Sequence, residues 1–303
     1  MESGGPTWNY FDLGTWSRKG TTTLPEAQLW FDRGLNWLYG FNHEEAIVCF
    51  EKVLQFDADC AMAHWGIAHC VGPNYNKLWE FFSPEEKVAA LDRAHRSPKQ
   101  AAAVADRATP AEHAILMALA ARFPPDSAIK DCGTWNDDFA DEMRKVHAAF
   151  PTDLDMTAIF AEALMNRTPW KLWDLQARGP AEGASTLEAQ VALERAFTND
   201  PTAWDHLGLL HMYTHLMEMS PTPEKALRHG DRLVDLVPDS GHLVHMATHI
   251  DVLCGDYQNV IWRNLRAVAV DRKLFDHAGG ENFYTIYRIH NLYHIPEGDR
   301  AVF

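Results

Sequence analysis

The sequence predicts an all-α protein, an α-solenoid of antiparallel helix pairs that is irregular in the middle. Apolar residues recur at spacings of three and four over much of residues 25–294, which is the period of an amphipathic helix. Breaks that contain proline and glycine divide this pattern into segments of helix length. Hydrophobic residues make up 47% of the 303 residues, which is enough to bury a sizeable core.

The first strong pattern follows an irregular lead-in that covers residues 1–24. Pro25 is a residue type found at helix starts, and Trp30, Gly34 and Trp37 follow on one face of the expected helix. Ala46, Phe50 and Val53 line a second helix. Gly34 and Ala46 allow the two helices to approach closely, and the aromatic side chains fill the space between them.

This pattern resembles the tetratricopeptide repeat, in which large, glycine, aromatic and alanine positions recur over about 34 residues. Residues 27–60 match it nearly throughout. Helices are also expected from residue 61 to a break at 72–76, twice within 83–122, at 136–150 and at 153–166, followed by a long loop at 166–183. Two more pairs are expected at 204–238 and 241–272, and a last single helix at 281–294.

Three segments resemble a divergent family of microbial tetratricopeptide-domain proteins: F-N-H-E-E-A at 41–46, W-G-x-A-x-x-x-G-P-N-Y-N at 65–76 and G-H-L-V-H-M-x-x-H-I at 241–250. The resemblance covers residues 25–294 and implies the fold rather than one activity. We therefore expect a single repeat domain at 25–303. Members of the family are often longer, so a C-terminal continuation is one expectation.

Histidines with helical spacing carry the functional signal. His211, His215 and Glu218 fall within about 60° on one helix face. Two further helices repeat the arrangement, and the expected metal ligands are His211, His215, His242, His245, His249, His290 and His294. Because the first helices of successive pairs line one groove in such an array, we expect the three faces to lie side by side.

Imidazole and carboxylate donors suit a transition metal such as Cu, Fe, Zn or Mn. The spacing at 211–218 lacks the glutamate that follows the first histidine of a zincin helix. It also reverses the Glu-x-x-His order of di-iron bundles. Hydrolysis and oxygen chemistry both stay open, with Glu218 as a ligand or general base.

Other polar residues receive more modest interpretations. Asp205 and Asp251 are candidate acceptors for imidazole N–H groups. The loop at 72–76 interrupts a repeat, and it is interpreted either as a folded loop that closes one end of the groove or as a spacer between irregular helix pairs. Packing or surface roles are expected for the other histidines considered, which are His43, His64, His69, His95, His113 and His147.

Two functional classes follow from these observations. The first is a metal-dependent enzyme, an oxygenase or a hydrolase, acting on a small organic substrate. The second is a protein-interaction scaffold that binds a peptide in the groove. Residues 204–218 and 242–253 contain no Lys or Arg, which disfavours a scaffold that captures acidic peptide tails.

Composition limits the partners. A formal net charge of −15 disfavours nucleic acid and anionic membranes, which both require basic surfaces. Five cysteines without a C-x-x-C pair favour a reducing compartment, and we expect a cytoplasmic protein without a membrane span. The weakly polar helix at 286–294 suggests either a longer array or a homodimer formed through this helix.

Overall fold

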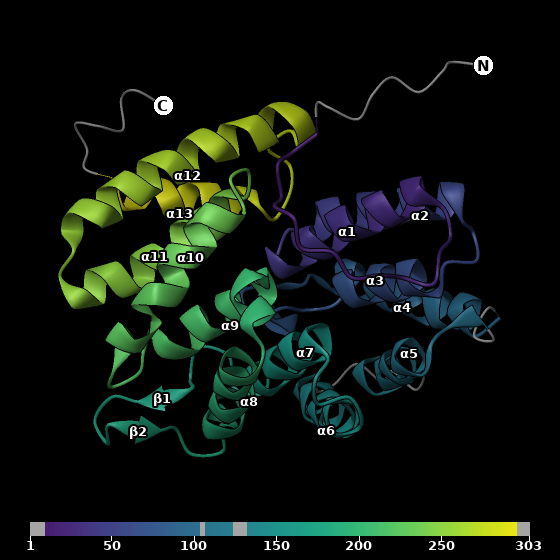
Figure 1. Ribbon diagram of the computed structural model, residues 1–303, viewed down its shortest axis with the longest axis horizontal. Coiled ribbons are helices and arrows are strands. Elements are labelled where there is room, and N and C mark those ends of the chain that lie inside the picture. The colour runs from purple at the N-terminus through teal and green to yellow at the C-terminus, as the bar shows by residue number, and fades with distance from the viewer. Residues whose placement is uncertain (1–9, 104–106, 124–131, 296–303) are drawn as a thin grey trace.

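The computed structural model describes residues 10–103, 107–123 and 132–295, without the side chains of 97–103, and is almost entirely helical (Figure 1). The prediction of an all-α fold is confirmed. The described residues contain thirteen α-helices and one pair of two-residue strands. The helices are α1 (Pro25–Tyr39), α2 (His43–Phe56), α3 (Ala61–Cys70), α4 (Pro84–Ala103), α5 (Pro110–Arg122), α6 (Gly133–Ala149), α7 (Leu154–Met165), α8 (Thr186–Asn199), α9 (Leu207–Met217), α10 (Leu227–Leu236), α11 (Gly241–Cys254), α12 (Tyr257–Ala278) and α13 (Thr285–Tyr293).

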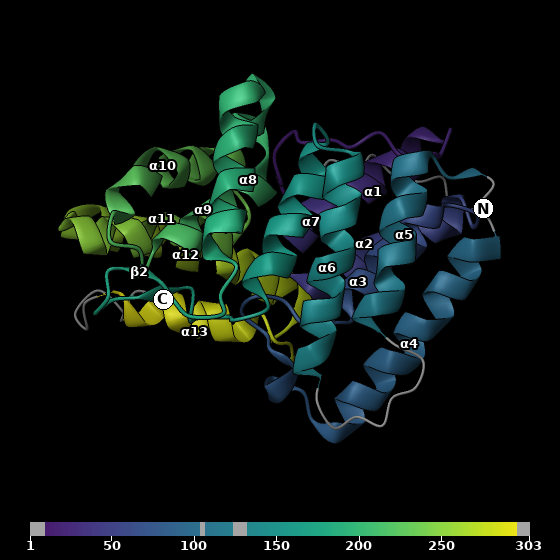
Figure 2. The ribbon, with the colours of Figure 1, turned by 90° about the horizontal axis from the view of Figure 1, so that it is seen from below.

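Nearly every helix packs against the next one in the chain, and many also touch the next but one. Contacts of the second kind join α1 to α3, α3 to α5, α7 to α9, α9 to α11 and α11 to α13. Viewed from below, α10 to α13 occupy one side of the molecule and α1 to α7 the other, with α8 between them (Figure 2). Contacts between α1 and α9 connect the two sides.

Two glycines bring α1 and α3 close to the ring of Phe50 on α2. A Cβ atom at Gly34 would lie 2.7 Å from that ring, and one at Gly66 would lie 2.5 Å from it. Both distances are shorter than real Cβ contacts, so the bare backbone is needed at both positions. The expected close approach at Gly34 is confirmed, and Gly66 adds a second one.

A third glycine places α9 against the end of α1. A Cβ atom at Gly208 would lie 2.5 Å from the ring of Tyr39. Because of this contact, the first turns of α9 lie next to the backbone of residues 39–41. His211 and His215, which are on α9, therefore lie beside the turn between α1 and α2.

A buried carboxylate holds the lead-in segment, α1, α7 and α9 together. Asp155 on α7 accepts hydrogen bonds from Tyr39 Oη at 2.6 Å, Arg18 Nη1 at 2.9 Å and Trp16 Nε1 at 3.2 Å. His206 Nε2 lies 3.3 Å from the same carboxylate. The other nitrogen of His206 accepts a hydrogen bond from the first turn of α9, so Nε2 carries the proton and faces the carboxylate. Four segments of the chain therefore meet at one negative charge.

The lead-in segment is irregular over its described residues, as expected, and lies along the late helices. The backbone N–H of Asp239 donates to the carbonyl of Asp12 at 3.0 Å, and the N–H of Asp12 donates to the Asp239 carboxylate at 2.6 Å. Gly14 has a φ of 79°, and a Cβ atom there would lie 2.3 Å from the carbonyl oxygen of Leu236. The segment thereby joins the beginning of the chain to the α10–α11 turn.

Three elements differ from the expectations. Helix α8 has no counterpart among them because its sequence carries no repeat signature. Trp204 lies in a 3₁₀-helix at Pro201–Asp205 rather than in the first helix of a pair, since Pro201 starts a tighter turn there. Helix α12 continues past residue 272 to Ala278, because the first strong helix breakers are Gly279 and Gly280.

The long loop at 166–183 contains the only strands among the described residues, β1 (Trp173–Asp174) and β2 (Gly179–Pro180). Trp170 in this loop has a φ of 62°. Its backbone N–H donates to the Tyr75 hydroxyl at 3.2 Å. The loop at 166–183 therefore lies against the loop at 72–76.

Candidate metal centre

The three histidine-bearing helix faces converge in the structure. Helix α9 packs against α11, and α11 packs against α13. Ring centroids of neighbouring histidines lie 4.7 to 6.5 Å apart and link all seven residues into one cluster. The seven are His211, His215, His242, His245, His249, His290 and His294.

The first group within this cluster is His211, His215 and His242. One nitrogen of each lies within 4.8 Å of one nitrogen of both others, and all three side chains are buried. A metal with Zn–N distances of about 2.0–2.1 Å holds its ligand atoms roughly 3.3 Å apart. Small movements of the rings would therefore close this group around one ion.

Hydrogen bonds engage the Nδ1 atoms of two of these rings and leave their Nε2 atoms available to a metal. His211 Nδ1 donates to the carbonyl of Tyr39 at 2.6 Å. His215 Nδ1 donates to Glu218 Oε1 at 3.0 Å. Both Nε2 atoms consequently carry a lone pair, and both are buried without a hydrogen-bond partner. Metal-bound histidines usually donate their second nitrogen to a carbonyl or carboxylate in this way.

His242 completes the group from α11. Its Nε2 lies 3.4 Å from the Asn76 amide nitrogen, and its Nδ1 is buried without a hydrogen-bond partner. Tyr287 stacks on the ring with centroids 4.2 Å apart. The backbone N–H of His242 donates to the Tyr284 hydroxyl at 2.9 Å. These contacts fix the position of the ring.

The protonation states suit metal binding. Burial lowers the pKa of His211 and of His242 well below the usual value, and neighbouring imidazoles lower both further. Burial also lowers the pKa of His215, although Glu218 opposes the shift. The three rings are therefore neutral near pH 7, which is the form that binds metal.

Glu218 lies between the first group and the rest of the cluster. One oxygen accepts from His215, and the other pairs with Nδ1 of His249. Burial alone would raise the pKa of Glu218, but His249 and His215 outweigh it and hold that pKa well below its usual range. The residue is a buried carboxylate that orients two imidazoles.

The second group is His245 on α11 with His290 and His294 on or next to α13. One nitrogen of each lies within 4.8 Å of the others, and only His245 is buried. His245 Nδ1 faces Asn264 Oδ1 at 2.6 Å, and the Asn264 amide donates to the carbonyl of Val260 at 2.7 Å. Asn264 therefore fixes the ring orientation of His245.

A cavity of about 150 Å³ opens between the two groups. The 72–76 loop and the 166–183 loop cover this region: Tyr75 lies against His215 with ring centroids 4.9 Å apart, and against Trp170 with centroids 5.2 Å apart. The loop at 72–76 thus contacts His215 and His242. The lining residues are Asn76, Trp170, His215, His242, His249, Phe283, Ile286, Tyr287 and His290.

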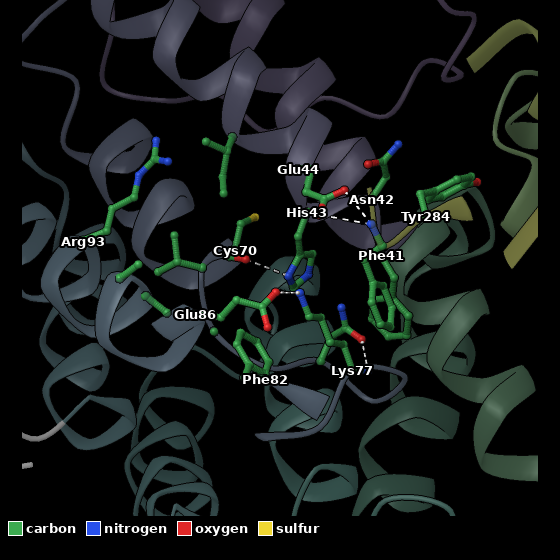
Figure 3. Close-up of a pocket in the computed structure, with 17 residues that line it drawn as sticks. Phe41, Asn42, His43, Glu44, Cys70, Lys77, Phe82, Glu86, Arg93 and Tyr284 are labelled. Carbon is green, nitrogen blue, oxygen red and sulfur yellow. Dashed lines mark hydrogen bonds and ion pairs between the residues drawn. The ribbon is translucent and has the colours of Figure 1, made fainter. Parts of the chain in front are cut away.

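A larger cavity of about 250 Å³ lies on the α2–α3 side of Phe41 (Figure 3). Lys77, Glu86 and Arg93 contribute charges to its wall, and Tyr284 closes the opposite side. The Phe41 ring also contacts His211, with centroids 4.5 Å apart. Phe41 thus separates this cavity from the first histidine group, and only the smaller cavity is lined by the clustered histidines.

The groups that accept hydrogen bonds from the clustered imidazoles differ from the expected ones. Asp205 pairs with Arg232, and Asp251 pairs with Arg263 at 3.1 Å. The expectation that these aspartates accept hydrogen bonds from imidazole N–H groups is wrong, because both carboxylates form ion pairs with arginines on neighbouring helices. The acceptors are the Tyr39 carbonyl, Glu218 and Asn264. A backbone carbonyl carries no signal in the sequence.

The remaining histidines fit their packing roles. His43 and His69 lie in a separate buried group with Glu162 and Arg122, where His69 Nε2 is 3.6 Å from the Glu162 carboxylate. Burial lowers the pKa of His69 to about 4. His64 and His95 face the backbone carbonyls of Ala58 and Phe123. None of these belongs to the cluster of seven.

A buried aspartate anchors α13, and it makes stability depend on pH. Burial raises the pKa of Asp271 to about 7, although Asn291 and Arg288 oppose the shift. In the unfolded chain the pKa of this aspartate is near 3.8. Between pH 3.8 and 7 the folded protein therefore binds one proton more than the unfolded chain, and its free energy of unfolding falls as pH rises, by up to about 1.4 kcal/mol per pH unit. Asp271→Asn removes this dependence. We expect wild type to lose stability relative to Asp271→Asn between pH 5 and 8 in denaturant titrations, and a constant difference would contradict the assignment.

Comparisons with known proteins add no further constraint. No protein-family model matches the sequence, and no curated protein matches it either. None of the helices in the described part of the chain is both long and apolar enough to span a bilayer.

Proposed function

We propose that the protein is a transition-metal-dependent enzyme that acts on a small organic molecule. His211, His215 and His242 would hold the metal, and the cavity of about 150 Å³ beside them would hold the substrate. The observation that carries the proposal is the pair of buried, unpartnered Nε2 atoms on His211 and His215, whose Nδ1 atoms are both engaged. Leaving buried polar atoms without partners costs about 1–3 kcal/mol each, and a bound cation removes this cost.

We also infer that the helix pairs form a tetratricopeptide-like array. The packing of Phe50 between Gly34 and Gly66 and the contacts between alternate helices support this inference. The α1–α9 contact is a departure, because an open solenoid keeps distant repeats apart. The histidine-lined cavity lies beside α9 and α11, on helices that the α1–α9 contact joins to the early part of the chain.

The ligand set suits two classes of reaction. A metal held by three neutral imidazoles supplies either an activated water for hydrolysis or a site for oxygen chemistry, depending on its identity. The side chains around the metal ligands contribute orientation and the cavity wall. Glu218 orients His215, and the ring of His290 lines the cavity beside the first histidine group.

The cavity limits the size of the substrate. An apolar cavity of about 150 Å³ accommodates a molecule the size of benzene. Trp170, Phe283 and Tyr287 supply flat apolar walls, and Asn76 supplies an amide. The site therefore fits a small, partly aromatic or unsaturated molecule with one polar group.

The experiment is metal analysis by mass spectrometry on protein purified without a histidine tag. We expect near-stoichiometric transition metal in wild type, either as isolated or after reconstitution. We expect the His211→Ala/His215→Ala variant to lose the metal that the group of His211, His215 and His242 would bind. His113→Ala/His277→Ala is the matched control, because both residues lie outside the cluster. No metal in wild type after reconstitution would overturn the proposal and favour the peptide-binding scaffold.

A further inference from the structure

The nitrogens of two histidines face each other in an arrangement that requires a cation. His245 Nε2 lies 2.8 Å from His249 Nε2. His249 Nδ1 faces the Glu218 carboxylate, and His245 Nδ1 faces the Asn264 carbonyl oxygen. Both Nδ1 atoms therefore carry the protons, since a carboxylate and an amide oxygen only accept; the Thr248 hydroxyl, 3.3 Å from His245 Nδ1, is the more distant neighbour of that atom. Two lone pairs then point at each other at hydrogen-bond distance.

The Asn264 orientation supports this assignment. Its amide nitrogen donates to the Val260 carbonyl at 2.7 Å, so the amide oxygen is the atom that faces His245. The opposite orientation would set two carbonyl oxygens against each other. A proton or a metal ion must therefore lie between or beside the two Nε2 atoms.

We propose that the protein binds a second transition-metal ion at His245, His290 and His294, with His249 as an additional ligand. This proposal rests on the metal-dependent function proposed above. The second group shares no residue with the first, and one nitrogen of each member lies within 4.8 Å of the others. Bringing His249 into the site requires its Nε2 to move from 2.8 Å to roughly 3.3 Å from that of His245, the separation of two ligands on one tetrahedral ion.

The number of donors also favours two ions. Seven imidazoles exceed the four ligands of a tetrahedral site, and divided between two ions they supply three and four. The cavity is lined by His215 and His242 from the first group and by His249 and His290 from the second. A substrate in this cavity would touch the ligands of both ions.

Glu218 connects the two sites. One of its oxygens orients His215 of the first group, and the other orients His249 of the second. A single buried carboxylate thus sets the tautomer of one ligand at each ion. Its negative charge also offsets part of the positive charge that two cations bring into the site.

The test is zinc stoichiometry of the full chain after removal of metal and equilibration with Zn²⁺ alone. We expect two equivalents in wild type and one in His290→Ala/His294→Ala, whose replaced side chains are exposed and not part of the core. We expect one equivalent in His211→Ala/His215→Ala and two in the His113→Ala/His277→Ala control. Far-UV circular dichroism and the thermal midpoint of each variant report whether it folds.

The outcomes separate this inference from the proposed function. One equivalent in wild type that persists in His290→Ala/His294→Ala would overturn the second site and leave the first intact. No bound zinc in wild type would overturn both. One equivalent that is lost only with His290 and His294 would overturn the assignment of the first group and retain the second.

Discussion

Replacing Glu218 with glutamine is expected to weaken metal binding by about 10- to 100-fold, although the residue is placed to orient ligands rather than to bind the ion. A carboxylate can accept an N–H hydrogen bond from His215 and from His249 at once. A glutamine offers one accepting oxygen and one donating nitrogen. The imidazole that faces the amide nitrogen must move its proton to Nε2, which removes the lone pair that the metal needs.

The measurement is a competitive titration with a chelator of known affinity, carried out on wild type, Glu218→Gln and Glu224→Gln. Glu224 is exposed on the segment that follows α9 and provides the matched control for loss of a negative charge. Because each site has one ligand oriented by Glu218, we expect at least one site to weaken. Equal affinity in Glu218→Gln and Glu224→Gln would show that the carboxylate does not set the tautomers.

Replacing Asp155 with alanine is expected to lower the free energy of unfolding by about 3–5 kcal/mol. The carboxylate accepts from Tyr39, Arg18 and Trp16 and lies 3.3 Å from His206. Burial alone would raise the pKa of Asp155, but His206 and Arg18 outweigh it and hold that pKa well below its usual range. Its removal leaves the buried Tyr39 hydroxyl and His206 Nε2 without the carboxylate that they share, and it leaves Arg18 with Asp153 as its remaining carboxylate partner.

Denaturant titration measures this loss, with Asp153→Asn as the control. Asp153 also pairs with Arg18, at 2.7 Å, and it caps α7 by accepting from the N–H of Met156. Asparagine keeps the cap and removes only a partly exposed charge, so we expect a loss near 1 kcal/mol. Equal losses in both variants would contradict the view that burial makes Asp155 the central residue of this network.

The sequence predicted the helices and the convergence of the seven histidines better than the surroundings of the site. The helical period alone places His211 and His215 on one helix face, and the same spacing recurs on the next two histidine-bearing helices. The pairing of helices explains why these faces are neighbours. Phe41, Asn76 and the Tyr39 carbonyl reach the site from more than 130 residues away in the chain. No local pattern encodes such contacts, because they depend on how helices that are distant in the chain pack together.

The same distinction explains the errors. Asp205 and Asp251 are close to the histidines in sequence, but Arg232 and Arg263 on other helices take up their charges. Helix α8 was missed because it carries amphipathic spacing without a repeat signature. Local period predicts where a helix lies and which residues share a face, whereas partner choice among charged residues is decided by packing over long distances.

The contact between the beginning and the late part of the chain has a consequence for synthesis on the ribosome. Glu44 accepts from the backbone N–H of Phe283, and the two residues are 239 positions apart. At 5–20 residues per second, roughly 10–50 s pass between translation of the first and of the second. Until α9 has been synthesised, α1 exposes the surface that α9 later covers, and Glu44 has its partner only after residue 283 follows. The early helices therefore expose this surface for longer than the helices of a repeat array whose units each bury their surface against the next.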